Sequence, residues 1–208
     1  MKPNLTLERV TFLAKLRGAA GFTLLELVIV LAIAAVLSSV AMPSFQEAMM
    51  NAKRNSEVSS LVGSLQRARS EAIKRSGRVA VCARDTDTSC GEDWSNGWLV
   101  FTDDGATIGD IDAGETILQV KQEAPENAVI TTLAKTGTGM SSPVAWPFVR
   151  FSSRGAANWR GSGTFLYCDP REEEGARAVN ITLSGDVRAA RRNASHELLN
   201  SFGTPVEC

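Results

Sequence analysis

Residues 21–42 read GFTLLELVIVLAIAAVLSSVAM, and this stretch decides how the rest of the chain is interpreted. From Phe22 onward it carries one charged side chain, Glu26, in an otherwise uncharged and mostly apolar run. A helix rises 1.5 Å per residue, so a run of about 21 residues is roughly 30 Å long and matches the hydrocarbon core of a bilayer. The sequence therefore predicts a membrane-spanning helix over residues 22–42.

The residues before the apolar run predict its orientation. Four basic side chains stand there against one acidic side chain: Lys2, Arg9, Lys15, Arg17 and Glu8. Basic flanks stay in the cytoplasm, so we expect the chain after Met42 to lie in the periplasm. A secretory signal has a shorter apolar region that ends at a small-residue cleavage site, whereas this run begins directly after Ala20-Gly21. The sequence thus favours a lasting anchor in the inner membrane.

Glu26 is an unfavourable residue for a spanning helix. A carboxylate at the bilayer centre costs on the order of 3 kcal/mol. In the first turns of the helix, water and the positive end of the helix dipole lessen that cost. We still expect a partner to compensate the charge of Glu26.

The string from Gly21 to Leu27, GFTLLEL, resembles the cleavage and methylation signature of type IV prepilins and type II secretion pseudopilins. The resemblance implies that a prepilin peptidase cuts between Gly21 and Phe22 and methylates Phe22. Removing the leader exposes an α-amino cation at Phe22, which can pair with Glu26 of a neighbouring subunit as helices bundle in the filament. Pro43 falls where many pilins also carry a proline. The same apolar surface would first hold the subunit in the membrane and then form the filament core.

A helical pattern continues from Pro43 to about Ser76. Its apolar positions recur at spacings of three and four residues: Phe45, Met49, Ala52, Val58, Leu61, Val62, Leu65, Ala68, Ala72 and Ile73. Charged side chains are expected mostly on the other faces: Lys53, Arg54, Glu57, Arg67, Arg69, Glu71, Lys74 and Arg75. Pro43 is a candidate kink, and Gly77 is the expected C-terminal cap.

Beyond Gly77 the pattern changes to short strands punctuated by Gly, Pro, Asn and Asp. The expected strands are Val79–Ala83, Trp98–Thr102, Thr116–Val120, Ala128–Thr132, Phe148–Ser152, Gly163–Cys168, Ala178–Leu183 and Asp186–Ala189. The predicted fold class is α+β, a pilin-like fold with one long N-terminal helix packed on antiparallel sheets. The expected organisation is a leader (1–21), a spanning helix (22–42), its amphipathic continuation (43–77) and a β-rich domain (78–208).

The β-rich part resembles the GspH/FimT-type minor pilins and pseudopilins. The matching strings are SNGWLVFTD at 95–103, DAGE at 112–115, Phe151-Ser152 before Gly155, and ITLSGDVR at 181–188. The resemblance implies a structural subunit of a type IV pilus that initiates or caps the fibre, or a minor pseudopilin of a type II secretion system. The implied partners are the prepilin peptidase, other minor pilins, the major pilin and the inner-membrane assembly platform. The subunit would end in an extracellular pilus or a periplasmic pseudopilus.

Four cysteines, Cys82, Cys90, Cys168 and Cys208, give an even count in an exported domain, which favours two disulfides. The preferred pairing among the three possible is Cys82 with Cys90 and Cys168 with Cys208. None of them forms the CxxC pair that zinc usually takes.

Arginines in the last third of the chain suggest a further function. Arg188, Arg191 and Arg192 follow the Ser184-Gly185 turn closely, and guanidinium groups fit phosphate. FimT-type pilins that take up DNA carry a GRxR motif at this turn, so DNA binding is a third candidate function. Here Asp186 replaces the first arginine of that motif and would repel phosphate. The net charge of −1 over 208 residues also argues against a general nucleic-acid binder.

Other constellations have plainer interpretations. The acidic stretch 103–115 suggests calcium, but its spacing does not fit an EF-hand, and a solvated hairpin loop is favoured. The tryptophans Trp94, Trp98, Trp146 and Trp159 suggest a binding platform, although Trp98 is expected in the core and the others as loop anchors or subunit contacts. Ser195-His196-Glu197 are sequence neighbours without a nucleophile elbow. We expect no catalytic site, metal or cofactor.

Overall fold

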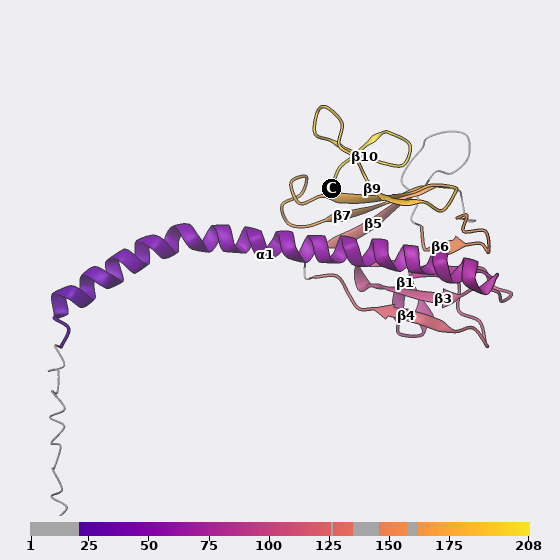
Figure 1. The fold of residues 1–208 in the computed structure, drawn as a ribbon, viewed down its shortest axis with the longest axis horizontal. Coiled ribbons are helices and arrows are strands. Elements are labelled where there is room, and N and C mark those ends of the chain that lie inside the picture. The colour runs from indigo at the N-terminus through magenta and orange to yellow at the C-terminus, as the bar shows by residue number, and fades with distance from the viewer. Residues whose placement is uncertain (1–20, 126, 135–145, 158–161) are drawn as a thin grey trace, which may run out of the picture. The chain divides into compact units, whose positions relative to one another are not determined.

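The computed structural model describes residues 21–125, 127–134, 146–157 and 162–208 (Figure 1). Most of the expected leader, together with Trp159 and Arg160, lies outside these residues. The chain divides into two compact units, residues 1–46 and 47–208, which are described separately. The observed class is α+β, with one long N-terminal helix and antiparallel sheets, as the sequence predicts.

Helix α1 covers Leu24–Arg75. Its N-terminus is capped by Thr23, whose side-chain Oγ1 accepts a hydrogen bond from the Glu26 amide at 3.2 Å. The Thr23 carbonyl accepts the first intrahelical bond, from the Leu27 amide at 3.1 Å. Pro43 lies inside the helix, so it does not end it.

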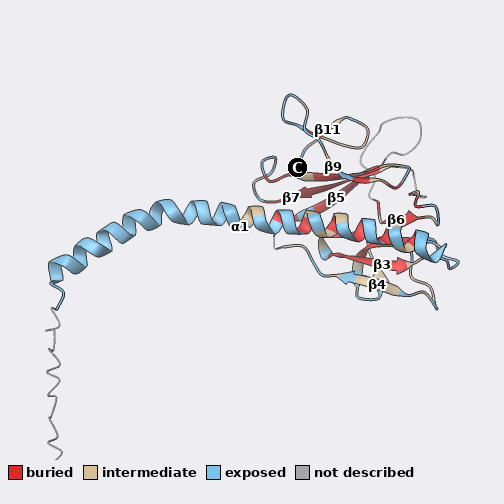
Figure 2. Cartoon of the chain, viewed as in Figure 1, coloured by how far each residue is buried: buried red, intermediate tan, exposed pale blue. Residues whose placement is uncertain are grey.

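In the second unit, one face of α1 is buried against the sheets (Figure 2). The buried positions recur at three- and four-residue spacing: Arg54, Glu57, Leu61, Ser64, Leu65, Ala68 and Ala72. The expectation that Arg54 and Glu57 lie on the solvent faces is wrong, because both are buried in line with Leu61. Glu57 is tolerated there because Lys121 Nζ lies 2.9 Å from its Oε1 and neutralises it.

The end of α1 also differs from the sequence prediction. The residue in the left-handed conformation is Ser76, with φ of 53°, and not Gly77. Its amide donates to the Ile73 carbonyl, and the Gly77 amide donates to the Ala72 carbonyl, which is the bonding pattern of a Schellman cap. A Cβ at Gly77 would lie 2.6 Å from Oδ2 of Asp104, so a larger residue there would displace that exposed side chain.

The first sheet has the strand order β2-β1-β3-β4, with β6 also paired to β1. Its strands are β1 (Val79–Thr86), β2 (Ser89–Cys90), β3 (Trp98–Thr102), β4 (Ile117–Lys121) and β6 (Phe148–Phe151). A short 3-10 helix, η1 (Trp94–Asn96), leads into β3. Alternate residues of β1 enter different apolar clusters: Val81 faces the main core, and Cys82 faces a smaller cluster on the other side.

The second sheet has the order β5-β7-β8-β9. Its strands are β5 (Val129–Ala134), β7 (Gly163–Cys168), β8 (Arg177–Ile181) and β9 (Val187–Ala189). A two-stranded pair, β10 (Leu198–Leu199) with β11 (Pro205–Val206), lies near it, and Leu198 joins an apolar cluster with Leu166 and Ala178. All eight predicted strands are present, while β2, β10 and β11 are too short to give a sequence pattern.

Tryptophans fill the core where α1 meets both sheets. Trp94, Trp98 and Trp146 are buried, and the indole Nε1 of Trp94 donates to the Trp146 carbonyl at 2.7 Å. Trp98 is in the core, as expected. The other two described tryptophans are core residues as well, so they form no exposed binding platform.

Two disulfides close the domain. Cys82 bonds to Cys90 and thereby ties β1 to β2, and Cys168 at the end of β7 bonds to Cys208. This is the pairing preferred from the sequence. The longer link fastens the last segment of the chain to the second sheet.

Candidate functional site

The expected processing point lies just ahead of α1. Gly21 and Phe22 precede the helix, whose first residue is Leu24, and both are exposed. The Phe22 side chain is 80% exposed, so this bond is accessible to another protein. The Thr23 cap fixes where the helix begins, which places Glu26 in the first turn.

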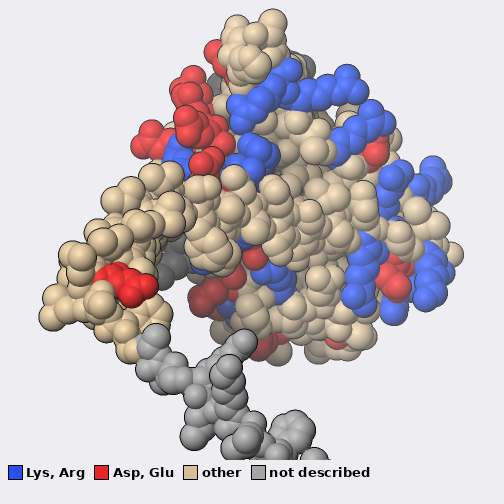
Figure 3. Space-filling model, turned by 60° about the vertical axis from the view of Figure 1, so that its left-hand side comes forward, with Lys and Arg blue, Asp and Glu red and all other residues tan. Residues whose placement is uncertain are grey.

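The described residues of the first unit, 21–46, are all exposed, and from Leu24 onward they form part of helix α1. The apolar side chains of this segment are half or more exposed, and the segment appears in Figure 3 as a nearly uncharged surface that carries one acidic group. Helix α1 is long and apolar enough to cross a membrane, with a mean hydropathy of 2.6 in its most apolar window. An exposed apolar surface of this extent requires lipid or partner helices. Glu26 is the residue of this surface that can make a polar contact with such a partner.

A second site lies where three segments of the second unit meet. Gly185, in the Ser184-Gly185 turn, has φ of 75°, and a Cβ there would lie 1.9 Å from the Gly155 carbonyl oxygen. Arg69 of α1 donates from Nε to that carbonyl at 3.0 Å and from Nη2 to the Ser184 carbonyl at 3.1 Å. The turn at Gly155 and the turn at Ser184-Gly185 belong to two of the strings that resemble GspH/FimT pilins. They contact each other and form a joint, and Arg69 holds both turns on helix α1.

The three arginines predicted as a DNA site have different surroundings. Arg188 on β9 is exposed and forms an ion pair with Asp186. Arg192 donates from Nη1 to the His196 carbonyl at 2.6 Å and from Nη2 to the Ala176 carbonyl at 3.3 Å. Arg191 is exposed. Because Arg188 and Arg192 already have partners in the domain, they are poorly prepared to bind phosphate.

The acidic loop between β3 and β4 is stabilised by its own carboxylates. Asp112 Oδ2 accepts from the Thr107 amide at 2.7 Å, and Glu115 accepts from the amides of Gly105 and Asp112. The hydrogen bonds from Thr107 hold the pKa of the Asp112 carboxyl below its usual range. Among the described residues, no group of three or more His, Cys, Asp or Glu side chains is placed to hold a metal.

The sequence predicts a solvated loop, but Asp103 at its start is buried. It is 0% exposed and forms an ion pair with Arg150, whose Nε lies 2.9 Å from its Oδ2. The Gly109 amide also donates to Oδ2, at 3.2 Å. Burial raises the pKa of the Asp103 carboxyl from 3.8 to about 6, although Arg150 and the Gly109 amide pull it down. This buried ion pair fixes the start of the loop to β6.

Four arginines interact on another part of the domain, and one of them, Arg192, was predicted as part of the DNA site. Arg54, Arg171, Arg177 and Arg192 come from α1, the loop after β7, β8 and the segment before β10. The positive charges of Arg171 and Arg192 act on both Arg54 and Arg177. Arg54 lies three residues before Glu57 and seven before Leu61, so the three side chains share one face of α1. This spacing is the one sequence signal that could have indicated a buried charge here.

Two family models match the chain. The prokaryotic N-terminal methylation motif matches residues 16–42, and the type II transport protein GspH matches residues 57–186. No curated protein matches the chain.

Three solved structures are similar in fold. The type IV minor pilin FimU of Pseudomonas aeruginosa, in space group P21, has a TM-score of 0.50 and 17% identity, over 70% of this chain and 91% of FimU. A second FimU crystal form has a TM-score of 0.49 and 19% identity, over 66% and 92% of the two chains. The minor pseudopilin EpsH of the Vibrio cholerae type 2 secretion system has a TM-score of 0.42 and 13% identity, over 66% and 95%.

Proposed function

This chain belongs to the family of the type II transport protein GspH, and we propose that it is a minor subunit of a type IV pilus that helps to initiate or cap the fibre. The observation that carries the proposal is the exposed apolar helix surface of residues 22–46 with Glu26 as its one charge. Such a surface suits a subunit that waits in a membrane and then enters a helix bundle. The role is structural, as in the minor pilins and pseudopilins of this family.

Maturation follows from the N-terminal methylation motif. A prepilin peptidase cuts between Gly21 and Phe22 and methylates the new N-terminus. The exposure of both residues ahead of α1 supports this step. The subunit is then anchored in the inner membrane by one helix, with its β-rich domain in the periplasm.

In the filament, Glu26 pairs with the Phe22 amine of a neighbouring subunit. Glu26 lies in the first turn of α1, one turn from the new N-terminus. Both charges are costly alone in an apolar bundle, and pairing offsets much of that cost. The pair sets the register between neighbouring helices. The neighbouring subunits include other minor pilins and the major pilin.

The proposal is tested by the intact mass and N-terminal sequence of the native protein, from cells with and without the prepilin peptidase. We expect a methylated Phe22 start that appears only with the peptidase. Purified pili should contain the processed chain in small amounts. An uncut chain in both strains would refute the pilin pathway and leave an ordinary anchored protein.

A minor pseudopilin of a type II secretion system is the second candidate, because the matching family is described by that transport role. The two candidates differ in what the cell loses without the gene. Deletion should abolish surface pili and leave exoprotein secretion intact if the chain serves a pilus. Loss of secretion with normal pili would assign it to the pseudopilus instead.

A further inference from the structure

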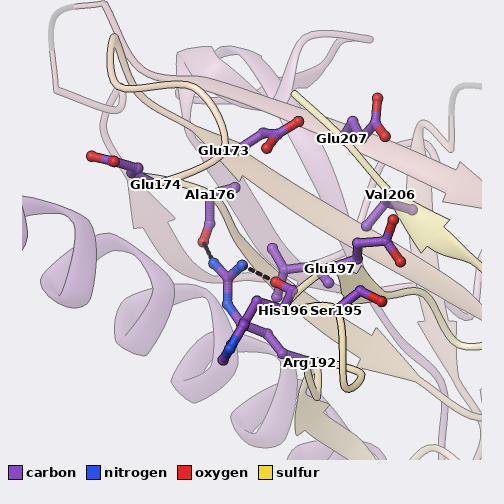
Figure 4. A pocket seen from close by; sticks show the side chains of 10 residues that line it. Glu173, Glu174, Ala176, Arg192, Ser195, His196, Glu197, Val206 and Glu207 are labelled. Atoms are coloured by element: carbon purple, nitrogen blue, oxygen red, sulfur yellow. Dashed lines mark hydrogen bonds between the residues drawn. The ribbon is translucent and has the colours of Figure 1, made fainter.

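A surface pocket of the second unit combines an apolar floor with an acidic rim (Figure 4). Ala176 and Leu198 are buried members of one apolar cluster, and the half-buried Val206 packs against it, so these three side chains form the floor. The rim carries four exposed glutamates, which are Glu173, Glu174, Glu197 and Glu207. The pocket has a volume of about 380 Å³ and therefore has room for side chains of a partner.

Negative charge dominates this pocket. In the part of the chain that the structure describes, the four glutamates form no ion pair. Among the described lining residues the one arginine is Arg192, which donates to the carbonyls of His196 and Ala176 at 2.6 and 3.3 Å. The domain thus already holds this guanidinium, and the pocket attracts positive charge. A ligand that suits both the floor and the rim has an apolar tip with cations beside it.

The turn between β8 and β9, residues 182–186, has an apolar tip. Leu183 is 65% exposed, more than any other large apolar side chain in the described part of the second unit. The Gly185 amide closes the turn by donating to the Thr182 carbonyl at 2.9 Å, and Arg69 holds the turn on α1 through the Ser184 carbonyl. A tip that is fixed before binding loses little conformational freedom when it docks.

Arginines accompany this tip. Arg188 on β9 follows the turn, Arg69 contacts it, and Arg154 lies in the adjoining turn of the joint. Arg188 is paired with Asp186. Arg69 and Arg154 form no ion pair among the described residues, so positive charge is in excess at the joint. The turn is therefore the complement of the pocket in both apolar character and charge.

The turn cannot enter the pocket of its own domain, because the two lie at different positions along α1. Arg69 contacts the turn, whereas Arg54 Nη1 lies 3.5 Å from the carbonyl oxygen of Glu174 at the pocket. Arg69 follows Arg54 by 15 residues on α1, which is about 22 Å at 1.5 Å per residue. A projection that fits a pocket elsewhere on an identical molecule makes a head-to-tail contact, and such a contact extends into a fibre when it does not close into a ring.

We propose that Leu183 docks into this pocket on a second copy of the chain, with Arg69 and Arg154 beside the glutamates of the rim. Burial of the leucine side chain supplies the apolar part of the affinity, and the opposite charges fix the orientation of the turn. The rim repels a polyanion such as DNA or an anionic membrane surface. This inference rests on the proposed function, because a repeating head-to-tail contact serves a fibre subunit.

The test uses the full chain in cells that assemble pili, expressed in two versions with different peptide tags. One version carries a photo-reactive amino acid at Ser195, which is exposed and lines the pocket. We expect a cross-link to the other version at a peptide that contains Leu183. Leu183→Asp in that version should lower the yield at least tenfold, because it removes the apolar contact and brings a carboxylate to the acidic rim. Ile108→Asp is the matched control at an aliphatic side chain that is 48% exposed in another loop, and it should leave the yield unchanged.

A charge exchange separates docking from misfolding. Arg154→Glu in the version that supplies the turn should lower the yield about fivefold, and so should Glu173→Lys with Glu174→Lys in the version that carries the probe. Combining the exchanged versions should restore part of the yield, because opposite charges then meet again. A combination that cross-links no better than either exchange alone would overturn the inference.

The remaining outcomes separate this inference from the proposed function. A processed chain that is present in pili without a cross-link between copies, or whose cross-link survives Leu183→Asp, would overturn the inference alone. A cross-link from Ser195 to another protein, to nucleic acid or to lipid in place of the second copy would also overturn it. A chain that cross-links between copies but is absent from every pilus would overturn the proposed function and the fibre role inferred here.

Discussion

At the scale of single residues, Glu26 carries most of the proposed function. It is exposed in the structure and is the one charge of residues 22–46. Its amide is held by the Thr23 cap, which fixes the backbone but leaves the carboxylate for a partner. Its proposed partner is the Phe22 amine of a neighbouring subunit.

We expect Glu26→Ala to be processed normally but to enter the filament about tenfold less, because the amine of the neighbouring subunit would then be shielded without a partner. Quantitative blotting of purified pili against membranes measures this ratio. Glu47→Ala is the matched control, since Glu47 is the next acidic residue on α1 and lies outside the apolar run. Equal incorporation of both variants would refute the pairing.

Asp103 makes the stability of the domain depend on pH. The pKa of the Asp103 carboxyl is raised from its ordinary value of 3.8 to about 6 in the folded state. Between these two pH values the folded state therefore binds the proton more tightly than the unfolded state does. The free energy of unfolding should therefore fall as pH rises from about 4 to about 6, and level off above. The direction is opposite to that of a carboxylate whose pKa is lowered by a salt bridge.

We expect Asp103→Asn to remove this fall, which should amount to about 1–2 kcal/mol once solvent screening near the loop is allowed for. Urea unfolding of the full chain in detergent, followed by the fluorescence of the buried tryptophans at pH 4 to 7, measures it. Asp110→Asn in the same loop is the control, because Asp110 is exposed. A variant that keeps the slope of the unaltered protein would contradict the role of Asp103.

At the scale of elements, sequence patterns predict the helices and strands in which the burial of a residue follows from its neighbours along the chain. The α1 register from Leu61 to Ala72 follows from apolar spacing, because burial on one face repeats with the period of the helix. The bounds of β3 and β7 follow instead from short, mostly apolar runs, which are buried on both faces. Arg54 and Glu57 could not be placed, because the Lys121 amine that makes burial of Glu57 tolerable lies far away in the sequence.

The candidate site divides in the same way. Gly21, Phe22 and Glu26 form a local motif, so their positions were predicted from the sequence alone. A surface pocket lined by Glu173, Arg192 and Glu207 brings together the loop before β8, the segment before β10 and the end of the chain (Figure 4), and no local pattern reports that proximity.

The joint at Gly185 gives a stability prediction. Gly185→Ala should cost more than about 2 kcal/mol, because it adds backbone strain at positive φ and drives a Cβ into the Gly155 carbonyl. Gly203→Ala is the control: Gly203 has φ of 82° but nothing within 4 Å of a Cβ, so only the strain of about 1 kcal/mol remains. Urea unfolding compares the two. Equal costs would show that the joint is not tightly packed.

The disulfides predict a second difference between elements. Replacing Cys168 and Cys208 by Ser should cost about 4 kcal/mol, against about 2.5 kcal/mol for Cys82 and Cys90, because the closed loop is longer. The sequence separations are 40 and 8 residues. Mass spectrometry under non-reducing conditions should first find both bridges in the unaltered protein. Free thiols at Cys168 and Cys208 would invalidate the pairing before any stability is compared.

At the scale of the whole molecule, charge is distributed unevenly over a chain with a net charge of −1. Figure 3 shows basic side chains gathered over one part of the second unit and acidic groups near them. The DNA-uptake alternative depends on how much of this positive charge is available to phosphate. The ion pair between Asp186 and Arg188 reduces it at the turn where FimT-type pilins carry their GRxR motif.

Removing that ion pair is the sharpest test of nucleic-acid binding by this molecule. We expect Asp186→Ala to bind duplex DNA several-fold more tightly at low salt than the unaltered chain, because Arg188 is then free to bind a phosphate. The slope of log affinity against log salt should steepen by about one for each additional phosphate that the protein neutralises. A gel shift with the full chain in detergent measures both, and Asp186→Ala/Arg188→Ala should match the unaltered chain because the pair carries no net charge. If instead Asp186→Ala binds no more tightly than the unaltered chain, the Asp186 pair does not restrain Arg188.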